Sequence, residues 1–192
     1  DLRKHKNNCE YFYKIRELDR DKEYEKLSST EKASRIIYLN KTCYNGLFRV
    51  NKQGYFNVPF GRYKNPNIIN EKVLRAVSDY LKNNDVKILN KDFAEILDKV
   101  EKDSFIYFDP PYNPISDSAS FTGYTFSGFG EKEQIRLKKF CDRLKKNGYK
   151  FLMSNSATLF ILNLYKDYRQ EIVSNGRSIN CKGDGRKKIN EI

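Results

Sequence analysis

The sequence predicts an α/β fold with a mostly parallel, Rossmann-like sheet, and three observations support this class. Short apolar runs alternate with amphipathic segments between residues 70 and 192, an order typical of parallel strands joined by helices. The run at 104–108 leads directly into Asp109-Pro110-Pro111-Tyr112, which places polar groups at the end of a buried strand, where open α/β sheets bind ligands. The chain has 192 residues and 39% hydrophobic content, enough to fill one core and support a small additional region.

The first region, residues 1–69, is expected to combine helices with a β-hairpin. A charged stretch at 1–27 is compatible with a helix. Ser28 and Glu31 have the spacing of a capping box, which predicts the start of a second helix. Two β-prone runs flank Lys52-Gln53-Gly54 and predict a hairpin.

The second region, residues 70–192, is expected to form the α/β domain. Asn70 is a suitable N-cap for a helix with a regular apolar face. We expect the elements that follow to be a strand at 86–89, a helix at 92–100, the strand at 104–108, a helix at 131–147, a strand at 149–153, a helix at 157–165, a strand at 168–173 and a final strand from 188. A polar loop at 113–130 is longer than a compact domain usually carries without a function, and a basic loop spans 175–188.

Composition narrows the classes of function. The net charge of +12 makes a polyanion such as nucleic acid the first candidate partner, a lysine-rich solvated surface being the alternative. The four cysteines lack CxxC spacing and there is one histidine, which disfavours disulfide frameworks, zinc sites and Ser-His-Asp catalysis. No apolar run approaches the roughly 20 residues of a membrane span. We therefore expect a cytoplasmic protein that uses no metal and contacts no membrane.

The Asp109-Pro110-Pro111-Tyr112 loop suits the methylation of an exocyclic amine on a base. The lone pair of adenine N6 is delocalised into the ring, so the nitrogen is a poor nucleophile. A carboxylate and a carbonyl that accept the amine hydrogens favour the pyramidal nitrogen as charge develops. The prolines lack N–H groups and have a fixed φ, so they stiffen the loop, while the aromatic ring can stack on a base that has left the duplex. An ordinary Asp-Pro turn after a core strand is the alternative.

Residues 40–66 carry arginine, asparagine and aromatic side chains at the ends of the predicted hairpin. Arginine suits guanine edges, asparagine suits phosphate or adenine, and aromatic rings suit base stacking. The segment therefore has the composition of a surface that reads bases and holds the DNA backbone. A surface hairpin with an aromatic core is the alternative.

The chain resembles the Dam-type DNA adenine-N6 methyltransferases, the α-group enzymes of the D12 class that methylate GATC. The resemblance covers residues 39–66 and 104–192. The longest matching strings are Thr42-Cys43-Tyr44-Asn45-Gly46-Leu47-Phe48-Arg49, Phe56-Asn57-Val58-Pro59-Phe60-Gly61-Arg62-Tyr63-Lys64 and Tyr107-Phe108-Asp109-Pro110-Pro111-Tyr112. Shorter strings are Ser120-Phe121-Thr122-Gly123-Tyr124, Leu152-Met153-Ser154-Asn155-Ser156 and Arg177-Ser178-Ile179-Asn180. Their order along the chain also fits, and the resemblance implies a class I methyltransferase sheet.

The resemblance implies roles for the catalytic residues, with S-adenosylmethionine as the methyl donor. Asp109 would hold the target amine and approach the methionine part of the donor. Pro110 would offer its carbonyl to the amine, and Tyr112 would stack on the flipped adenine. Asp92 and Phe93 fall where the family contacts the adenine of the donor, while the alternative for Phe93 is the apolar face of its own helix.

The resemblance also implies that residues 1–69 recognise double-stranded DNA and residues 70–192 form the catalytic domain. Arg49 would contact a guanine edge, and Tyr44 would wedge into the duplex beside the target. The remaining assignments are base-methyl contacts for Leu47 and Pro59 and phosphate contacts for Asn45, Arg62 and Tyr63.

One departure from the family pattern concerns the glycine-rich donor loop, of the form Phe-x-Gly-Gly-Gly, that follows the first strand. No string here matches it, so we expect that loop and the first strand to lie upstream of Asp1. Donor binding by this chain is therefore open, and a non-catalytic DNA-binding fragment or pseudoenzyme is a second hypothesis. A third is an amine methyltransferase acting on RNA or protein, although those usually carry Asn where Asp109 stands. We expect a monomer, acting alone or with a cognate restriction endonuclease.

Overall fold

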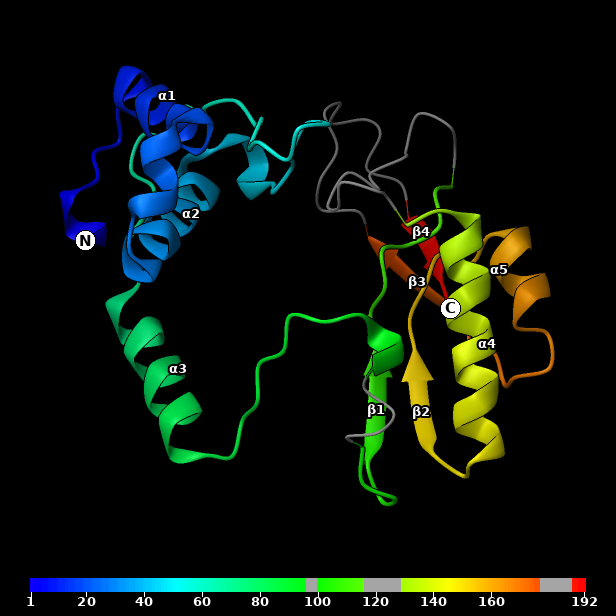
Figure 1. Cartoon of the computed structure of the whole chain (residues 1–192). Helices are drawn as coiled ribbons and strands as arrows, with labels where there is room; N and C mark the ends of the chain where they lie inside the picture. The colour runs from blue at the N-terminus through cyan, green and yellow to red at the C-terminus, as the bar shows by residue number, and fades with distance from the viewer. Residues whose placement is uncertain (96–99, 116–128, 177–187) are drawn as a thin grey trace. The chain divides into compact units, whose positions relative to one another are not determined.

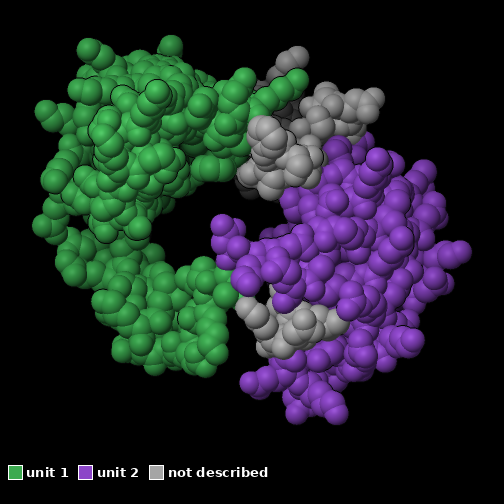
Figure 2. Space-filling model, viewed as in Figure 1, with its two compact units in different colours: residues 1–89 green, residues 90–192 purple. Residues whose placement is uncertain are grey.

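The computed structural model describes residues 1–95, 100–115, 129–176 and 188–192. The chain divides into two units, Asp1–Leu89 and Asn90–Ile192, which Figure 2 draws in green and purple. The predicted division by role, between residues 69 and 70, stays a prediction. Within the described residues no helix has the length and apolar character to cross a membrane.

Two helices and four short 3-10 turns build the first part of unit 1. Helix α1 spans Cys9–Glu17 and α2 spans Ser29–Thr42 (Figure 1). The 3-10 turns are η1 at Leu2–Lys4, η2 at Leu18–Arg20, η3 at Lys22–Lys26 and η4 at Tyr44–Gly46. The predicted capping box is confirmed: the backbone N–H of Glu31 donates to Ser28 Oγ over 3.2 Å, and that of Ser28 donates to Glu31 Oε2 over 2.9 Å. The core of the unit consists of Phe12, Tyr38, Leu39, Cys43, Phe56 and Val58.

The predicted hairpin is present as a short antiparallel ladder. Val50 bridges to Phe56, and the Asn51 N–H donates to the Tyr55 carbonyl over 2.9 Å. Asn51 also closes the turn, because its Oδ1 accepts from the N–H groups of Gln53 and Tyr55. Gly54 has a φ of 86°, a left-handed conformation that a residue without Cβ adopts freely.

Asp19 attaches the hairpin to the helices. Its Oδ2 accepts from the Phe56 N–H over 2.8 Å and pairs with Arg35 Nη2 over 2.8 Å, while its Oδ1 pairs with Arg20 Nη1 over 2.6 Å. The Arg35 side chain is only 4% exposed, and its Nε donates to the carbonyl of Ile15. A charge buried this deeply requires its partner, so the acid couples α2 to the hairpin.

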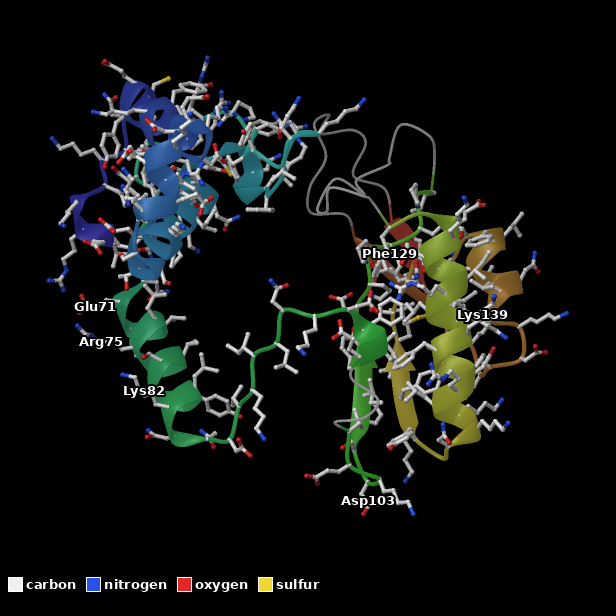
Figure 3. The ribbon with its side chains drawn as sticks, viewed as in Figure 1. Glu71, Arg75, Lys82, Asp103, Phe129 and Lys139 are labelled. Atoms are coloured by element: carbon white, nitrogen blue, oxygen red, sulfur yellow. The ribbon has the colours of Figure 1, made fainter. Side chains whose placement is uncertain are left out.

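Helix α3, Glu71–Asn83, completes the regular structure of unit 1. The predicted cap is confirmed, because Asn70 Oδ1 accepts from the Val73 N–H over 3.4 Å. Glu71, in the first turn, pairs with Arg75 one turn later and with Arg3; Figure 3 labels Glu71 and Arg75 on this helix. The predicted strand at 86–89 is wrong for the described residues, where no second segment pairs with it and it lies in coil.

Unit 2 contains the predicted parallel strands. β1, Phe105–Phe108, pairs in parallel with β2, Lys150–Met153, and the register places Phe108 opposite Met153. Helix α4, Glu131–Lys146, packs beside them and α5, Leu159–Leu164, joins the same core (Figure 1). That core consists of Phe108, Leu137, Phe140, Cys141, Leu144, Ile161 and Tyr165. The described sheet is thus small, and the prediction of a mixed α/β fold with parallel strands is confirmed.

Of the two strands expected near the chain end, the one from residue 188 is confirmed and the one at 168–173 is wrong. β3, Val173–Gly176, pairs antiparallel with β4, Lys188–Glu191, whereas a strand was predicted at 168–173. Tyr168 explains the shift, because its hydroxyl donates to Asp142 Oδ1 over 2.7 Å and its ring packs on Phe151. A residue tied to the core in this way belongs to the connection before the strand.

Three predicted segments fall partly outside the described residues. Of the predicted helix at 92–100, one 3-10 turn at 93–95 is described, and residues 96–99 are not. The same holds for 116–128 of the polar loop and 177–187 of the basic loop. The predicted helices at 131–147 and 157–165 are confirmed with slightly shorter bounds.

Replacing Asp19 with alanine should destabilise unit 1 strongly. The change leaves the buried Arg35 guanidinium without its acid, a loss of about 3 kcal/mol in the free energy of unfolding. Glu17→Ala is the matched control, since Glu17 also pairs with Arg20 but is exposed, and it should cost less than about 1 kcal/mol. Urea denaturation of both variants measures the difference, and equal losses would contradict the coupling role of Asp19.

Candidate functional site

The carboxyl end of β1 carries an exposed acid. Because β1 and β2 are parallel, Asp109 after Phe108 lies beside Ser154 after Met153. Ser154 Oγ donates to Asp109 Oδ1 over 3.1 Å. The Tyr107 hydroxyl lies 3.0 Å from the same Ser154 oxygen, and since the Ser154 proton goes to Asp109, Tyr107 is the donor. A chain of two hydroxyl groups therefore orients the carboxylate.

The rest of the loop places a carbonyl and a ring next to the acid. Pro110 and Tyr112 are both half-buried, and the two prolines provide no backbone donor. Burial raises the pKa of the Tyr112 hydroxyl, and the carboxylates of Glu191 and Asp109 raise it further. The phenol is therefore neutral at physiological pH, which suits a ring that stacks on an uncharged base.

Buried amide side chains lie beneath this loop. Gln134, in the first turn of α4, donates from Nε2 to the Pro111 carbonyl over 2.9 Å. Asn155 Oδ1 accepts from the Asn113 N–H over 2.9 Å, and Asn155 Nδ2 donates to Gln134 Oε1 over 3.1 Å. Both amide side chains have no exposed surface, so the loop rests on a fully buried polar layer.

The predicted donor-contact residues, Asp92 and Phe93, lie at the start of the 3-10 turn at 93–95 and contact α4, forming a second cluster in unit 2. Arg136 donates from Nη1 and Nη2 to the two carboxylate oxygens of Asp92, over 2.8 and 2.7 Å. These hydrogen bonds lower the pKa of Asp92 to about 2, so the carboxylate stays ionised at neutral pH. The same guanidinium lies 4.1 Å from the centre of the Phe93 ring, which also packs on Phe140. The contact of Asp92 and Phe93 with a donor stays a prediction.

In unit 1, the hairpin positions Arg49. Its Nε donates to Asn57 Oδ1 over 2.7 Å and its Nη2 donates to the Asn57 carbonyl over 3.3 Å. The two residues face each other because the Asn57 N–H donates to the Arg49 carbonyl in the ladder. The guanidinium is exposed and its orientation is set by a neighbour on the opposite arm of the hairpin.

The other predicted DNA contacts gather on the segments beside this hairpin. Tyr44 and Pro59 are joined by a backbone hydrogen bond of 2.8 Å, and both are exposed. Tyr63 is exposed as well, and Leu47 is half-buried. Unit 1 thus brings the seven predicted contact residues onto the neighbouring stretches 44–49 and 59–63.

Two of these residues have left-handed backbone conformations. Asn45 has a φ of 54° and Arg62 a φ of 55°. Asparagine tolerates this region, but for arginine the conformation costs roughly 1–3 kcal/mol and is typical of functional segments. The preceding Gly61 permits the turn, since a Cβ at that position would lie 2.6 Å from the Cys43 carbonyl oxygen.

Sequence reasoning missed several residues that hold the loop and the acids. Ser154 and Asn155 belong to a string that was noted only for its resemblance. The sequence could have indicated Gln134, since it is a polar residue on the apolar helix face formed by Leu137 and Cys141. No local pattern could have indicated Arg136, because its contact with Asp92 joins residues far apart in the sequence.

Among the described residues no group of three or more His, Cys, Asp or Glu side chains could hold a metal ion. The loop at Asp109 offers one oriented carboxylate, the backbone carbonyl of Pro110 and an aromatic ring. Such groups can accept hydrogen bonds from an amine and stack on a planar ring.

Comparison with known proteins identifies similar chains. A model of the D12 class N6 adenine-specific DNA methyltransferases matches residues 1–179. The chain is 49% identical over 179 residues to the Type II methyltransferase M.MjaIII of Methanocaldococcus jannaschii, covering 93% of this chain and 61% of that protein. It is 40% identical over 186 residues to the Type II methyltransferase M1.LlaDCHI of Lactococcus lactis subsp. cremoris, covering 97% of this chain and 66% of that protein.

A DNA adenine methylase of Salmonella typhi is 34% identical over 187 residues, covering 97% of this chain and 64% of that protein. The chain thus spans between 61% and 66% of the length of these three relatives. The match to the family extends over unit 1 and most of unit 2, so it includes both the hairpin and the loop at Asp109.

Replacing Arg136 with alanine should raise the pKa of Asp92 from about 2 toward its ordinary value near 4. The pair stabilises the folded protein at pH values above the pKa of Asp92 in the unfolded chain, and this stabilisation is lost as the pH falls through the pKa in the folded protein. The free energies of unfolding of the variant and the parent should therefore differ above about pH 4 and converge near pH 2. Carboxyl NMR titration measures the shift. Lys138→Ala, which removes the partner of Asp142 on the same helix, is the control and should leave the Asp92 titration unchanged.

Proposed function

The chain belongs to the D12 class N6 adenine-specific DNA methyltransferases, and from this premise we propose that the protein transfers a methyl group from S-adenosylmethionine to N6 of adenine in double-stranded DNA, at GATC. The observation that carries the proposal is the loop at the end of β1, where a hydroxyl chain orients the Asp109 carboxylate beside the Pro110 carbonyl and the Tyr112 ring. The other groups have roles around this loop, and bound S-adenosylmethionine supplies an electrophilic methyl group on a sulfonium.

Asp109 and Pro110 act on the target amine. Because Ser154 donates to Oδ1 of Asp109, it fixes the plane of the carboxylate, and we assign Oδ2 to one hydrogen of the amine. The Pro110 carbonyl accepts the other hydrogen. Two acceptors aimed at one NH₂ group localise its lone pair, and they stabilise the positive charge that develops on nitrogen as the N–C bond forms. The C–S bond of the donor breaks at the same time and its electron pair stays on the sulfur. The nitrogen then gives one proton to the Asp109 carboxylate, which is exposed and releases it to solvent, so the product is the neutral methylamine.

Tyr112 holds the adenine once it has left the duplex. A base must be extruded before its exocyclic amine can reach the Asp109 carboxylate and the Pro110 carbonyl, and unstacking costs a few kcal/mol. Stacking on an aromatic ring restores about 1–3 kcal/mol of this cost. The neutral phenol suits this role, since a charged ring would repel the acidic groups nearby.

The exposed residues around the hairpin contact the DNA. Arg49 reads a guanine edge, with Asn57 holding its guanidinium in place before binding. Tyr44 wedges beside the target base. Leu47 and Pro59 contact base methyl groups, and Asn45, Arg62 and Tyr63 bind phosphates. The net charge of +12 adds a general electrostatic attraction to the polyanionic DNA, which does not depend on the base sequence.

We propose that Asp92 and Phe93 contact the adenine of the donor. An ionised carboxylate accepts from an exocyclic amine, and the apolar ring packs on the base. We further propose that the protein is a cytoplasmic monomer working with a cognate restriction endonuclease. The last point is supported by the relatives with 49% and 40% identity, both of which carry the name Type II methyltransferase.

Tritiated methyl transfer by the full-length protein tests the activity and the site together. We expect incorporation into a GATC duplex and little into one carrying GTTC. Asp109→Ala should lower turnover by on the order of a hundredfold or more with little loss of DNA affinity, because the carboxylate acts at the transfer step. Equal incorporation into both duplexes would overturn the GATC assignment, and near-normal turnover of the variant would show that Asp109 is only a turn residue.

Arg49 and Arg62 should respond differently to removal. Arg49→Ala should reduce the preference for GATC over a noncognate duplex by roughly 1–3 kcal/mol, because a base contact discriminates between sequences. Arg62→Ala should weaken both duplexes in similar proportion and lower the salt slope by about one, as expected of a phosphate contact. Titration of each variant against both duplexes at two salt concentrations is the measurement. An unchanged cognate-to-noncognate ratio for Arg49→Ala would exclude it as the guanine reader.

A further inference from the structure

The two amide side chains beneath the loop at Asp109 form hydrogen bonds with the backbone of that loop. Gln134 comes from α4 and Asn155 follows β2, and neither has any exposed surface. A buried amide is costly unless its hydrogen-bonding groups find partners. Here the partners are backbone groups of the loop itself, on either side of Tyr112.

Gln134 and Asn155 tie the peptide groups that flank Tyr112. Gln134 Nε2 donates to the carbonyl of Pro111, the residue before the ring, over 2.9 Å. Asn155 Oδ1 accepts from the N–H of Asn113, the residue after it, over 2.9 Å. The φ and ψ of Tyr112 are the torsions between these two peptide groups, so fixing both fixes the direction of its Cα–Cβ bond.

Further hydrogen bonds hold the Gln134 and Asn155 side chains themselves in place. Asn155 Nδ2 donates to Gln134 Oε1 over 3.1 Å, so the two amides also hold each other. Asn155 exchanges two backbone hydrogen bonds of 2.9 Å with Ile192, and its Oδ1 also accepts from the Ser156 N–H. Gln134 lies in the first turn of the sixteen-residue helix α4. None of these supports lies within the loop that they hold.

We infer that Gln134 and Asn155 are positioning residues that set the ring of Tyr112 and select the Pro110 carbonyl as the acceptor for the substrate amine. The Pro111 carbonyl already accepts from Gln134, whereas the Pro110 carbonyl accepts no hydrogen bond from the residues that the structure describes, so we assign the substrate amine to Pro110. The role given to the ring and to the carbonyl rests on the proposed function. The restraint on Tyr112 rests on the hydrogen bonds alone and is tested separately.

A fluorescent ring at position 112 measures the restraint without any substrate. The chain contains no tryptophan, so Tyr112→Trp introduces a single indole whose anisotropy and acrylamide quenching report its mobility. In this background, Gln134→Met keeps the side-chain volume but removes the donor to Pro111. We expect lower indole anisotropy and stronger quenching at a temperature well below unfolding.

Gln170→Met is the matched control. Gln170 Nε2 donates to the Leu162 carbonyl over 2.9 Å, the same kind of bond in the same unit, but to a residue of α5. This variant should leave the indole signal unchanged. Thermal unfolding of each variant shows that the comparison is made between folded proteins. Gln134→Asn, whose amide is one methylene too short for Pro111, serves if Gln134→Met does not fold, and it should give the same mobile indole.

Activity is then measured with the native Tyr112 in the full-length protein. Gln134→Met should lower kcat by roughly ten- to a hundredfold through misplacement of the reacting groups, while KM for DNA changes by less than about twofold. Gln170→Met should leave both constants near those of the parent. A loss that falls on KM alone would overturn the positioning role.

The two proposals fail in different ways. If the parent protein transfers no methyl group to DNA, the proposed function is wrong, and the indole measurement still decides whether Gln134 restrains position 112. If the parent is active but the indole is as immobile in the Gln134 variants as in the parent background, the positioning role is overturned and the proposed function stands.

Discussion

The parallel pairing of β1 with β2 is the constraint on which the site depends. Its register sets Phe108 opposite Met153, so the next residues, Asp109 and Ser154, emerge side by side at one edge. Phe108 holds that edge in place, because its buried ring packs edge-on against Phe140 and Phe151. A slip of one residue would turn Phe108 out of the core and would separate the acid from its hydroxyl partner.

Two polar systems meet at the loop, and their surroundings suit their roles. The hydroxyl chain of Tyr107 and Ser154 reaches an exposed carboxylate, which must remain free to meet a substrate. The amides of Gln134 and Asn155 lie in the interior, where a hydrogen bond is stronger and an unpaired group is costly. The exposed system orients the Asp109 carboxylate proposed to meet the substrate amine, and the buried system fixes the backbone on either side of Tyr112.

Local patterns in the sequence predicted local structure well. The capping box at Ser28, the helix at 131–147 and the strand before Asp109 depend on neighbouring residues and were confirmed. The strand expected at 168–173 was wrong because Tyr168 is held by Asp142, 26 positions away, and no local pattern reports such a contact. For the same reason the sequence indicated the loop at Asp109 as a site but not the residues that support it.

The hairpin shows how a charged side chain can be prepared for recognition. A free arginine has many rotamers, and ordering one on binding costs roughly 1–2 kcal/mol of side-chain entropy. Asn57 restricts Arg49 through two hydrogen bonds, and the ladder that aligns them is held to α2 by Asp19 and Arg35. A buried ion pair in the helical part of unit 1 thus supports the orientation of a guanidinium on its surface. In the proposed base contact of Arg49, part of the ordering cost of binding is then met when the protein folds, which leaves more of the contact energy for discrimination between bases.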